Sequence, residues 1–251
     1  MSALSVALDI LKVFTFAEPA LNQADLARRL DHPKATVHRA LKALRESGLL
    51  EYDARTRLYS PGMRLFELGQ IFRSQSHFLD LLNKRLQRLC ETCGHTGYIT
   101  IFDGSDLMVL RMIRGSSPLA IATAPGYRAA SHGTSNGRAM LALLDDGDWQ
   151  QRVPEPLPFV SRKTPADHAE LREIIGRIRS TGRSATENES YEGVASQSVA
   201  IRDPDSGEIY GVAISYPASL LDAAAREDIA FALDKLRAEM SRQAPAAAPR
   251  A

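Results

Sequence analysis

The stretch LNQADLARRLDHPKATVHRALKALRESGLLEYD, residues 21–53, decides the fold of the N-terminal part of the chain. Asn22 precedes a short helical pattern and Asp25 follows three positions later, as in the capping box that starts many helices. After a break at residues 31–33, apolar side chains between positions 37 and 44 recur at helical spacings of four and three. This pattern predicts two short helices joined by a tight turn.

The second of these helices carries basic and hydrogen-bonding side chains away from its apolar stripe. Gly48 ends it, and LLEYD, ARTR and LYS then predict a strand, a turn and a returning strand. A solvated helix face would have the same charges, but the helix order, the tight turn and the basic hairpin together favour a winged helix-turn-helix that binds DNA. The residues expected to contact DNA are Lys34, Ala35, Thr36, His38, Arg39 and Lys42 on the helix, and Arg55 and Arg57 on the wing.

The composition of the whole chain is that of an ordinary soluble protein. It has 251 residues, 44% of them apolar and 24% charged, with a formal net charge of +1, and this length allows two domains. No stretch approaches the ~18 apolar residues of a membrane span. The N-terminus has neither the basic lead-in nor the cleavage site of a secretion signal. We therefore expect a cytoplasmic protein without a membrane partner.

The sequence predicts an α+β chain with the winged helix-turn-helix at residues 1–62 and a linker helix at residues 63–76. A C-terminal α/β domain follows at residues 77–243, and residues 244–251 form a tail expected to be disordered. Strands are expected at residues 98–102, 107–113, 117–123, 196–201 and 209–215. Helices are expected at residues 136–144, in a segment that Thr164, Pro165 and Asp167 open and that ends before Gly182, and around residues 229–240.

Two cysteines, Cys90 and Cys93, form a C-x-x-C pair near the end of a helical pattern. A structural zinc site usually needs a second pair of ligands, and the sequence has no further cysteine. A redox or metal role stays open, but small buried or half-buried side chains are the simpler interpretation. We expect neither a metal nor a cofactor.

Three segments resemble the N-terminal domain of the IclR family of bacterial transcriptional regulators: SVALDILKVF, the stretch at residues 21–53, and RLYSPGMRLFELG. Within them, PKATVHRALKAL is similar to the recognition helix of the family and MRLFELG to the start of its linker helix. The resemblance implies a GAF-like effector-binding fold in the C-terminal domain. It also implies a homodimer or dimer of dimers that binds double-stranded operator DNA. A C-terminal domain that only oligomerises remains the alternative.

The pentapeptide GTSNG, residues 133–137, matches the G-x-S-x-G pattern of a hydrolase nucleophile elbow. An elbow needs a strand before its serine, and the preceding SHG is poor strand material. The same residues at a helix start could bind a carboxylate, or could form a plain helix cap. By resemblance, SNGRAMLA is similar to the family segment that borders the effector pocket. We therefore expect Ser135, Asn136 and Gly137 to contact a carboxylate-bearing effector, and we expect no enzyme.

By the same resemblance, ENESYEGVASQSVAI and GVAISYP supply further walls of the pocket. Strand alternation places Ser196 and Ser198 on one face, where their hydroxyls favour a ligand with hydroxyls as well as a carboxylate, although hydrogen bonds within the sheet could also satisfy them. The expected effector is a small organic acid of the aromatic, hydroxy or keto class. Arg111 lies in an apolar strand and must be paired, at an edge, or directed at a ligand. The remaining residues expected to bind the effector are Arg111, Glu189, Ser196, Ser198, Ala213 and Ser215.

Overall fold

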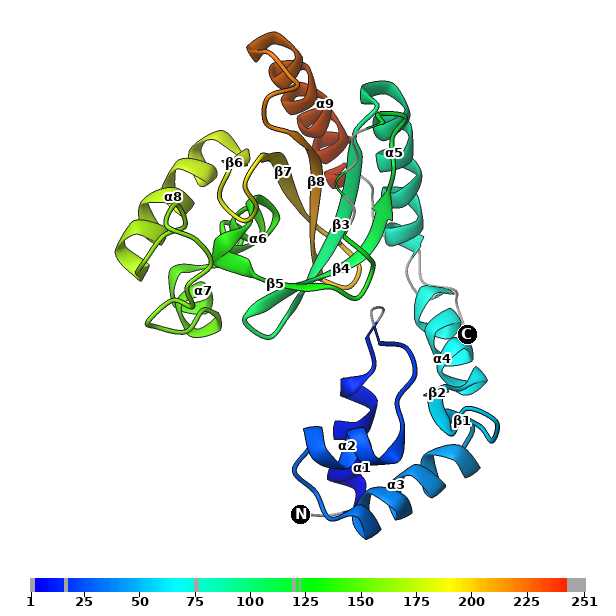
Figure 1. Cartoon of the computed structure of the whole chain (residues 1–251). Helices are drawn as coiled ribbons and strands as arrows, with labels where there is room; N and C mark the ends of the chain where they lie inside the picture. Colours follow the sequence, from blue (N-terminus) through cyan, green and yellow to red (C-terminus); the bar gives the residue numbers. More distant parts are fainter. Residues whose placement is uncertain (1–2, 16–17, 75–76, 119–120, 122, 243–251) are drawn as a thin grey trace. The chain divides into compact units, whose positions relative to one another are not determined.

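The computed structural model describes residues 3–15, 18–74, 77–118, 121 and 123–242. The chain divides into two compact units, Met1–His77 and Phe78–Ala251, which are coloured along the sequence in Figure 1. The expected tail at residues 244–251 lies outside the described residues. No helix in the described part of the chain is long and apolar enough to span a bilayer.

The first unit is a winged helix-turn-helix, as predicted. The cap expected at Asn22 is present, because its Oδ1 accepts a 2.9 Å hydrogen bond from the N–H of Asp25. Gly48 ends the second helix of the motif with a φ of +73°, a conformation that glycine adopts without strain. The elements are α1 (Ala3–Val13), α2 (Gln23–Arg29), α3 (Lys34–Glu46), the antiparallel wing strands β1 (Leu50–Asp53) and β2 (Leu58–Pro61), and α4 (Met63–Ser74).

A small apolar core holds this unit together. Ile10, Leu26 and Leu41 come from three different helices and are each 0% exposed. Because the inward stripe of α3 is packed against α1 and α2, its opposite face is left to solvent. The core thus determines which side of α3 is exposed.

The second unit is built on an antiparallel sheet of six strands in the order β5-β4-β3-β8-β7-β6. Apolar side chains of α5 and α9 pack on one face, and α6, α7 and α8 lie on the other side of the sheet (Figure 1). The strands are β3 (Thr96–Asp103), β4 (Asp106–Ile113), β5 (Arg128–Ala130), β6 (Ser184–Glu187), β7 (Val194–Arg202) and β8 (Ile209–Pro217). The helices are α5 (His77–Cys93), α6 (Ser135–Leu141), α7 (Asp146–Arg152), α8 (His168–Thr181) and α9 (Ala223–Ser241).

The prediction of a strand at residues 117–123 is wrong at the four of these positions that the structure describes. Ser117, Pro118, Ile121 and Thr123 are not in a strand, and the remaining positions lie outside the described residues. The edge of β4 is instead occupied by the chain around β5, since Val109 exchanges backbone hydrogen bonds with Gly126 and Tyr127. The pattern of the sequence also did not predict α7 or β6, which are each short and carry few apolar side chains.

A substitution of Gly137 in α6 tests how closely this helix packs against the backbone of Ser131. A Cβ at Gly137 would overlap the backbone of Ser131, whereas a Cβ at Gly176 in α8 would have no neighbour within 4 Å. We expect Gly137→Ala to lower the free energy of unfolding by about 1–3 kcal/mol through overpacking. The matched Gly176→Ala should instead stabilise α8 by about 0.5–1 kcal/mol. Denaturant unfolding measures both, and equal effects would contradict the close contact.

Candidate functional site

The outward face of α3 presents the residues expected to contact DNA. Lys34, Ala35, His38, Arg39 and Lys42 are exposed, and Thr36 is half-buried. Within the described part of the chain, Lys34 and Arg39 have no ion-pair partner, and Lys42 Nζ lies 3.8 Å from Glu46. Exposed cations without strong partners are free to pair with phosphates.

The wing hairpin ends in a tight turn that exposes both of its arginines. The Asp53 carboxylate accepts hydrogen bonds from the N–H groups of Arg55, at 2.8 Å, and of Thr56. These hydrogen bonds lower the pKa of Asp53 below its usual value, and the bond from the Arg55 N–H has the largest effect. Arg57 takes a φ of +59° at the end of the turn. The turn therefore holds its own carboxylate and directs Arg55 and Arg57 to solvent.

The second unit contains a cavity with an empty volume of about 660 Å³, part of which is open to solvent. It lies between the sheet and the start of α6, and the segment between β6 and β7 closes one side. Every lining residue is uncharged at neutral pH in its ordinary form. They are Tyr98, Thr100, Leu107, Val109, Ile121, Thr123, Tyr127, Ala129, Thr134, Ser135, Asn136, Thr186, Ser190, Tyr191, Val194, Ser196, Ala213 and Ser215.

Three serines form a continuous hydroxyl chain on the wall of this cavity. Ser135 from α6 and Ser215 from β8 each lie 3.0 Å from the hydroxyl of Ser196 on β7. These three hydroxyls carry three protons and share two hydrogen bonds, so one proton is left for another acceptor whichever way the bonds run. The chain is therefore a hydrogen-bond donor to whatever enters the cavity.

Asn136 and three tyrosines complete the polar part of the lining. Asn136 is 7% exposed, and its buried Oδ1 has no hydrogen-bond partner among the described residues. The Tyr98 hydroxyl bonds to the backbone of Ile121 and Thr123, and the Tyr127 and Tyr191 hydroxyls lie 2.6 Å apart. Burial raises the pKa of Tyr98, and burial together with Tyr127 raises the pKa of Tyr191 to about 12. These phenols stay neutral at physiological pH.

Four residues that the sequence associated with the effector do not line the cavity. Arg111 on β4 pairs with Ile99, which belongs to the core on the α5 and α9 side, and its Nη1 donates to Leu110 O. Gly137 donates its N–H to the capping hydroxyl of Thr134, at 3.0 Å. Ser198 is 1% exposed and faces Ser184 across β6 and β7. The fourth is Glu189.

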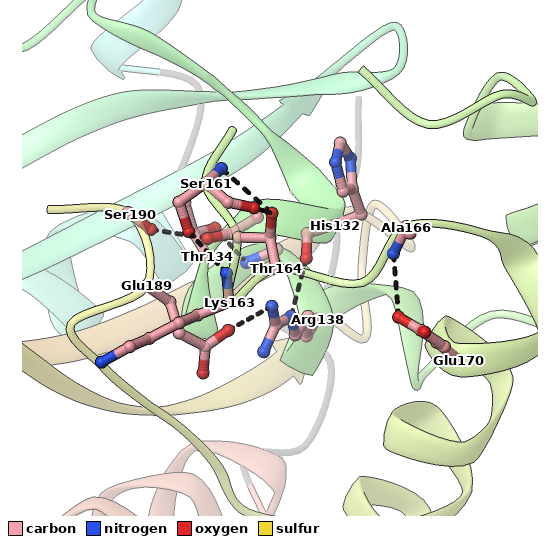
Figure 2. A network of polar contacts seen from close by, with 12 residues as sticks. His132, Thr134, Arg138, Ser161, Lys163, Thr164, Ala166, Glu170, Glu189 and Ser190 are labelled. Atoms are coloured by element: carbon pink, nitrogen blue, oxygen red, sulfur yellow. Dashed lines mark hydrogen bonds and ion pairs between the residues drawn. The ribbon is translucent and has the colours of Figure 1, made fainter. Parts of the chain in front are cut away.

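Glu189 instead forms an ion pair with Arg138 of α6 (Figure 2). Arg138 is 3% exposed, and its Nη2 lies 2.5 Å from Glu189 while its Nε donates to the His132 carbonyl at 2.6 Å. The neighbouring Ser190 hydroxyl donates to the Gly133 carbonyl at 2.5 Å. These contacts fasten the segment that closes the cavity to the turn that begins α6.

Among the described residues, the serine of the GTSNG pentapeptide has no base as a hydrogen-bond partner. Its hydroxyl bonds to Ser196, whereas the downstream His168 contacts the Val153 carbonyl through Nε2 at 3.0 Å. A nucleophilic serine needs a base within hydrogen-bond reach. The residue before Ser135 also follows a short 3-10 turn and not a strand. The geometry therefore lacks the parts of a nucleophile elbow.

The two cysteines are free thiols in an apolar setting. Cys90 is buried and Cys93 half-buried, and desolvation raises the pKa of both, that of Cys90 to about 12. Among the described residues, no group of three or more His, Cys, Asp or Glu side chains is placed to hold a metal ion. A protonated thiol is a poor nucleophile and a poor metal ligand.

A winged helix-turn-helix unit and a second unit with a cavity, in one chain, are typical of the class of ligand-responsive DNA-binding regulators. Two family profiles match the chain: the IclR helix-turn-helix domain at residues 3–54, and the bacterial transcriptional regulator IclR C-terminal domain at residues 73–242. The chain therefore belongs to the IclR family, whose members are transcriptional regulators and not enzymes.

Relatives and solved structures are similar over most of the chain. The regulator BhcR of Paracoccus denitrificans is 29% identical over 216 residues, covering 86% of this chain and 77% of the relative. The probable regulator SauR of Cupriavidus necator is 27% identical, covering 83% of each. An IclR-type regulator from Silicibacter sp. TM1040 superposes with a TM-score of 0.85 at 24% identity, covering 99% of this chain and 98% of that one. An IclR homologue from Microbacterium hydrocarbonoxydans, solved with 4-hydroxybenzoate, has a TM-score of 0.81 at 20% identity and covers 96% and 100%.

The Arg138–Glu189 ion pair generates a stability prediction. Glu189→Gln leaves the Arg138 cation buried without its counter-charge, which should lower the free energy of unfolding by about 3 kcal/mol. The control is Glu187→Gln, which removes the half-exposed partner of Arg226 and should cost about 0–1 kcal/mol. Urea unfolding of the three proteins measures the difference. Equal costs would show that the Arg138 pair is solvated.

Proposed function

We propose that this protein is a ligand-responsive transcriptional regulator whose effector is a small hydroxylated organic acid bound in the cavity of the second unit. The observation that carries the proposal is the hydroxyl chain of Ser135, Ser196 and Ser215 on the cavity wall. Its spare proton suits an anionic oxygen, since hydrogen bonds to charged acceptors are stronger than those to neutral ones.

The uncharged lining limits the charge of the effector. No Lys, Arg or His side chain is among the lining residues of the described chain, and the nearby Arg138 already pairs with Glu189. The hydroxyl chain has one proton left to donate to a carboxylate, and a second carboxylate would be buried with neither this donor nor a counter-charge. A monocarboxylate is therefore favoured over a dicarboxylate.

The amide oxygen of Asn136 favours a second polar group on the effector. Among the described residues this buried oxygen has no hydrogen-bond partner, which costs free energy, and a hydroxyl on the ligand can donate to it. Tyr98, Tyr127 and Tyr191 add aromatic surface to the same cavity. The 4-hydroxybenzoate in the Microbacterium hydrocarbonoxydans homologue combines these features, and it is the first compound to test.

The proposed response is a shift between two conformations. A ligand changes DNA affinity only if it binds one conformation of the protein more tightly than the other, and the coupling is reciprocal. Operator DNA should therefore change the affinity for the effector by the same factor as the effector changes the affinity for DNA.

The proposed assembly is a homodimer or a dimer of dimers. Helix-turn-helix proteins usually read two half-sites about one helical turn apart, which requires two recognition helices. In the first unit, α1 exposes Leu4 and Leu8, and α4 exposes Met63, Phe66 and Ile71. A helix with several exposed apolar side chains gains stability when a second copy covers them.

The proposed DNA contact of the wing predicts a change in salt dependence. Arg55→Ala should weaken binding to all DNA sequences alike and reduce the slope of log affinity against log salt by about one. Arg88→Ala, an exposed change on α5, should leave the slope as it is. Fluorescence anisotropy over a salt series measures both slopes, and an unchanged slope in Arg55→Ala would remove this residue from the interface.

The proposed effector site predicts a separation of ligand response from DNA binding. Ser196→Leu fills the cavity and removes the centre of the hydroxyl chain, so it should abolish thermal stabilisation by 4-hydroxybenzoate or related acids. Operator affinity without ligand should stay within about threefold of the original, because the substitution lies outside the DNA-binding unit. Ser180→Ala on α8 is the control that should respond normally.

Two outcomes would count against this proposal. A response that survives in Ser196→Leu would place the effector elsewhere. Binding of no aromatic, hydroxy or keto acid, with DNA binding intact, would favour a second unit that only oligomerises.

A further inference from the structure

Gln23, the first residue of α2, links the two helices of the DNA-binding motif through both atoms of its side-chain amide. Its Nε2 donates to the backbone carbonyl of Lys34 at 3.2 Å. Its Oε1 lies 3.1 Å from Nδ1 of His38, one turn into α3. The sequence pattern did not single out Gln23, because a polar residue at the start of a helix is common.

The Lys34 carbonyl determines which way the amide of Gln23 points. A carbonyl oxygen can only accept a hydrogen bond, so the NH₂ group must face Lys34 and the oxygen must face His38. An amide oxygen also only accepts. The Nδ1 of His38 must therefore carry a proton and donate it to Gln23.

This hydrogen bond determines the chemistry of the other ring nitrogen. A neutral imidazole carries one N–H, so with Nδ1 protonated the Nε2 of His38 is a hydrogen-bond acceptor. His38 is exposed on the outward face of α3. Among the other residues expected there, lysine and arginine only donate, alanine does neither, and threonine does either. His38 is thus the side chain of this set that is fixed as an acceptor.

We propose that His38 accepts a hydrogen bond from an amino group in the major groove, that of adenine or cytosine, and that Gln23 is the positioning residue that makes it do so. In the major groove, adenine N6 and cytosine N4 are donors, whereas guanine N7 and O6 and thymine O4 are acceptors. The Nε2 lone pair of His38 accepts from the former and is repelled by the latter. Lys34 and Arg39 suit the opposite pattern, the acceptor edge of guanine.

The first test measures the tautomer of His38 directly. Long-range ¹H–¹⁵N NMR spectra of the full-length protein, at an alkaline pH where imidazole is neutral, distinguish protonated Nδ1 from protonated Nε2. His38→Ala identifies the resonance. We expect Nδ1–H in the unmodified protein and in Gln23→Glu, which keeps the accepting oxygen, and a shift towards Nε2–H in Gln23→Leu. Protonated Nε2 in the unmodified protein, or no change in Gln23→Leu, would overturn the role of Gln23.

The second test measures base preference by selection from randomised operator DNA. We expect His38→Ala to lose about 3- to 10-fold of the preference at one base pair in each half-site while the other positions keep theirs. Replacing the adenine of that pair by purine, or its cytosine by 2-pyrimidinone, removes the amino group and should cause the same loss in the unmodified protein. Gln23→Leu should weaken the preference at the same position.

Two results of these experiments would overturn the proposal that His38 contacts a base. One is an equal loss of affinity for every sequence in His38→Ala, which would make His38 a backbone contact. The other is a preference at that base pair that survives in the unmodified protein when the adenine or cytosine lacks its amino group.

Discussion

The ion pair between Arg138 and Glu189 connects α6 with the segment between β6 and β7, and residues of both line the cavity of the second unit. Arg138 is almost completely buried, and its guanidinium donates hydrogen bonds to Glu189 and to the His132 carbonyl. Glu189 belongs to the segment between β6 and β7, which contributes Ser190 and Tyr191 to the cavity wall. Because a buried cation requires a counter-charge, the two sides of the cavity are tied to each other. The charge thus has a structural role, and the cavity is left with neutral hydroxyls.

The neutrality of the cavity and the charge of α3 suit the two units to different partners. In the first unit, Lys34 and Arg39 are exposed and unpaired within the described residues, so they are available to a polyanion. In the second unit, Ser135, Ser196 and Ser215 offer directional hydrogen bonds in a small volume, which favours discrimination by shape and by the placement of polar groups. The same chain therefore uses Coulomb attraction for DNA and hydrogen bonding for its proposed effector.

The DNA-binding unit could be predicted closely from the sequence. Its signals are local: the Asn22 cap, the apolar stripe of α3 and Gly48 all act within a few residues of where they stand. The strand expected at residues 117–123 failed for the opposite reason. An apolar run does not show which segment will occupy a sheet edge. In the structure, Gly126 and Tyr127 pair with Val109 at this edge through backbone hydrogen bonds.

The sequence by itself determined the helix-turn-helix, the basic face of α3 and the serines on alternating positions of β7. The reason is that the spacing of residues along a helix or a strand determines which side chains share a face. Only the tertiary structure decided that Ser196 lines the cavity while Ser198, two residues later, is covered, and that Glu189 pairs with Arg138. It also placed the amide of Gln23 against His38 across fifteen residues of chain. These pairings depend on how separate elements pack against each other, and the spacing of residues along one element carries no information about the other.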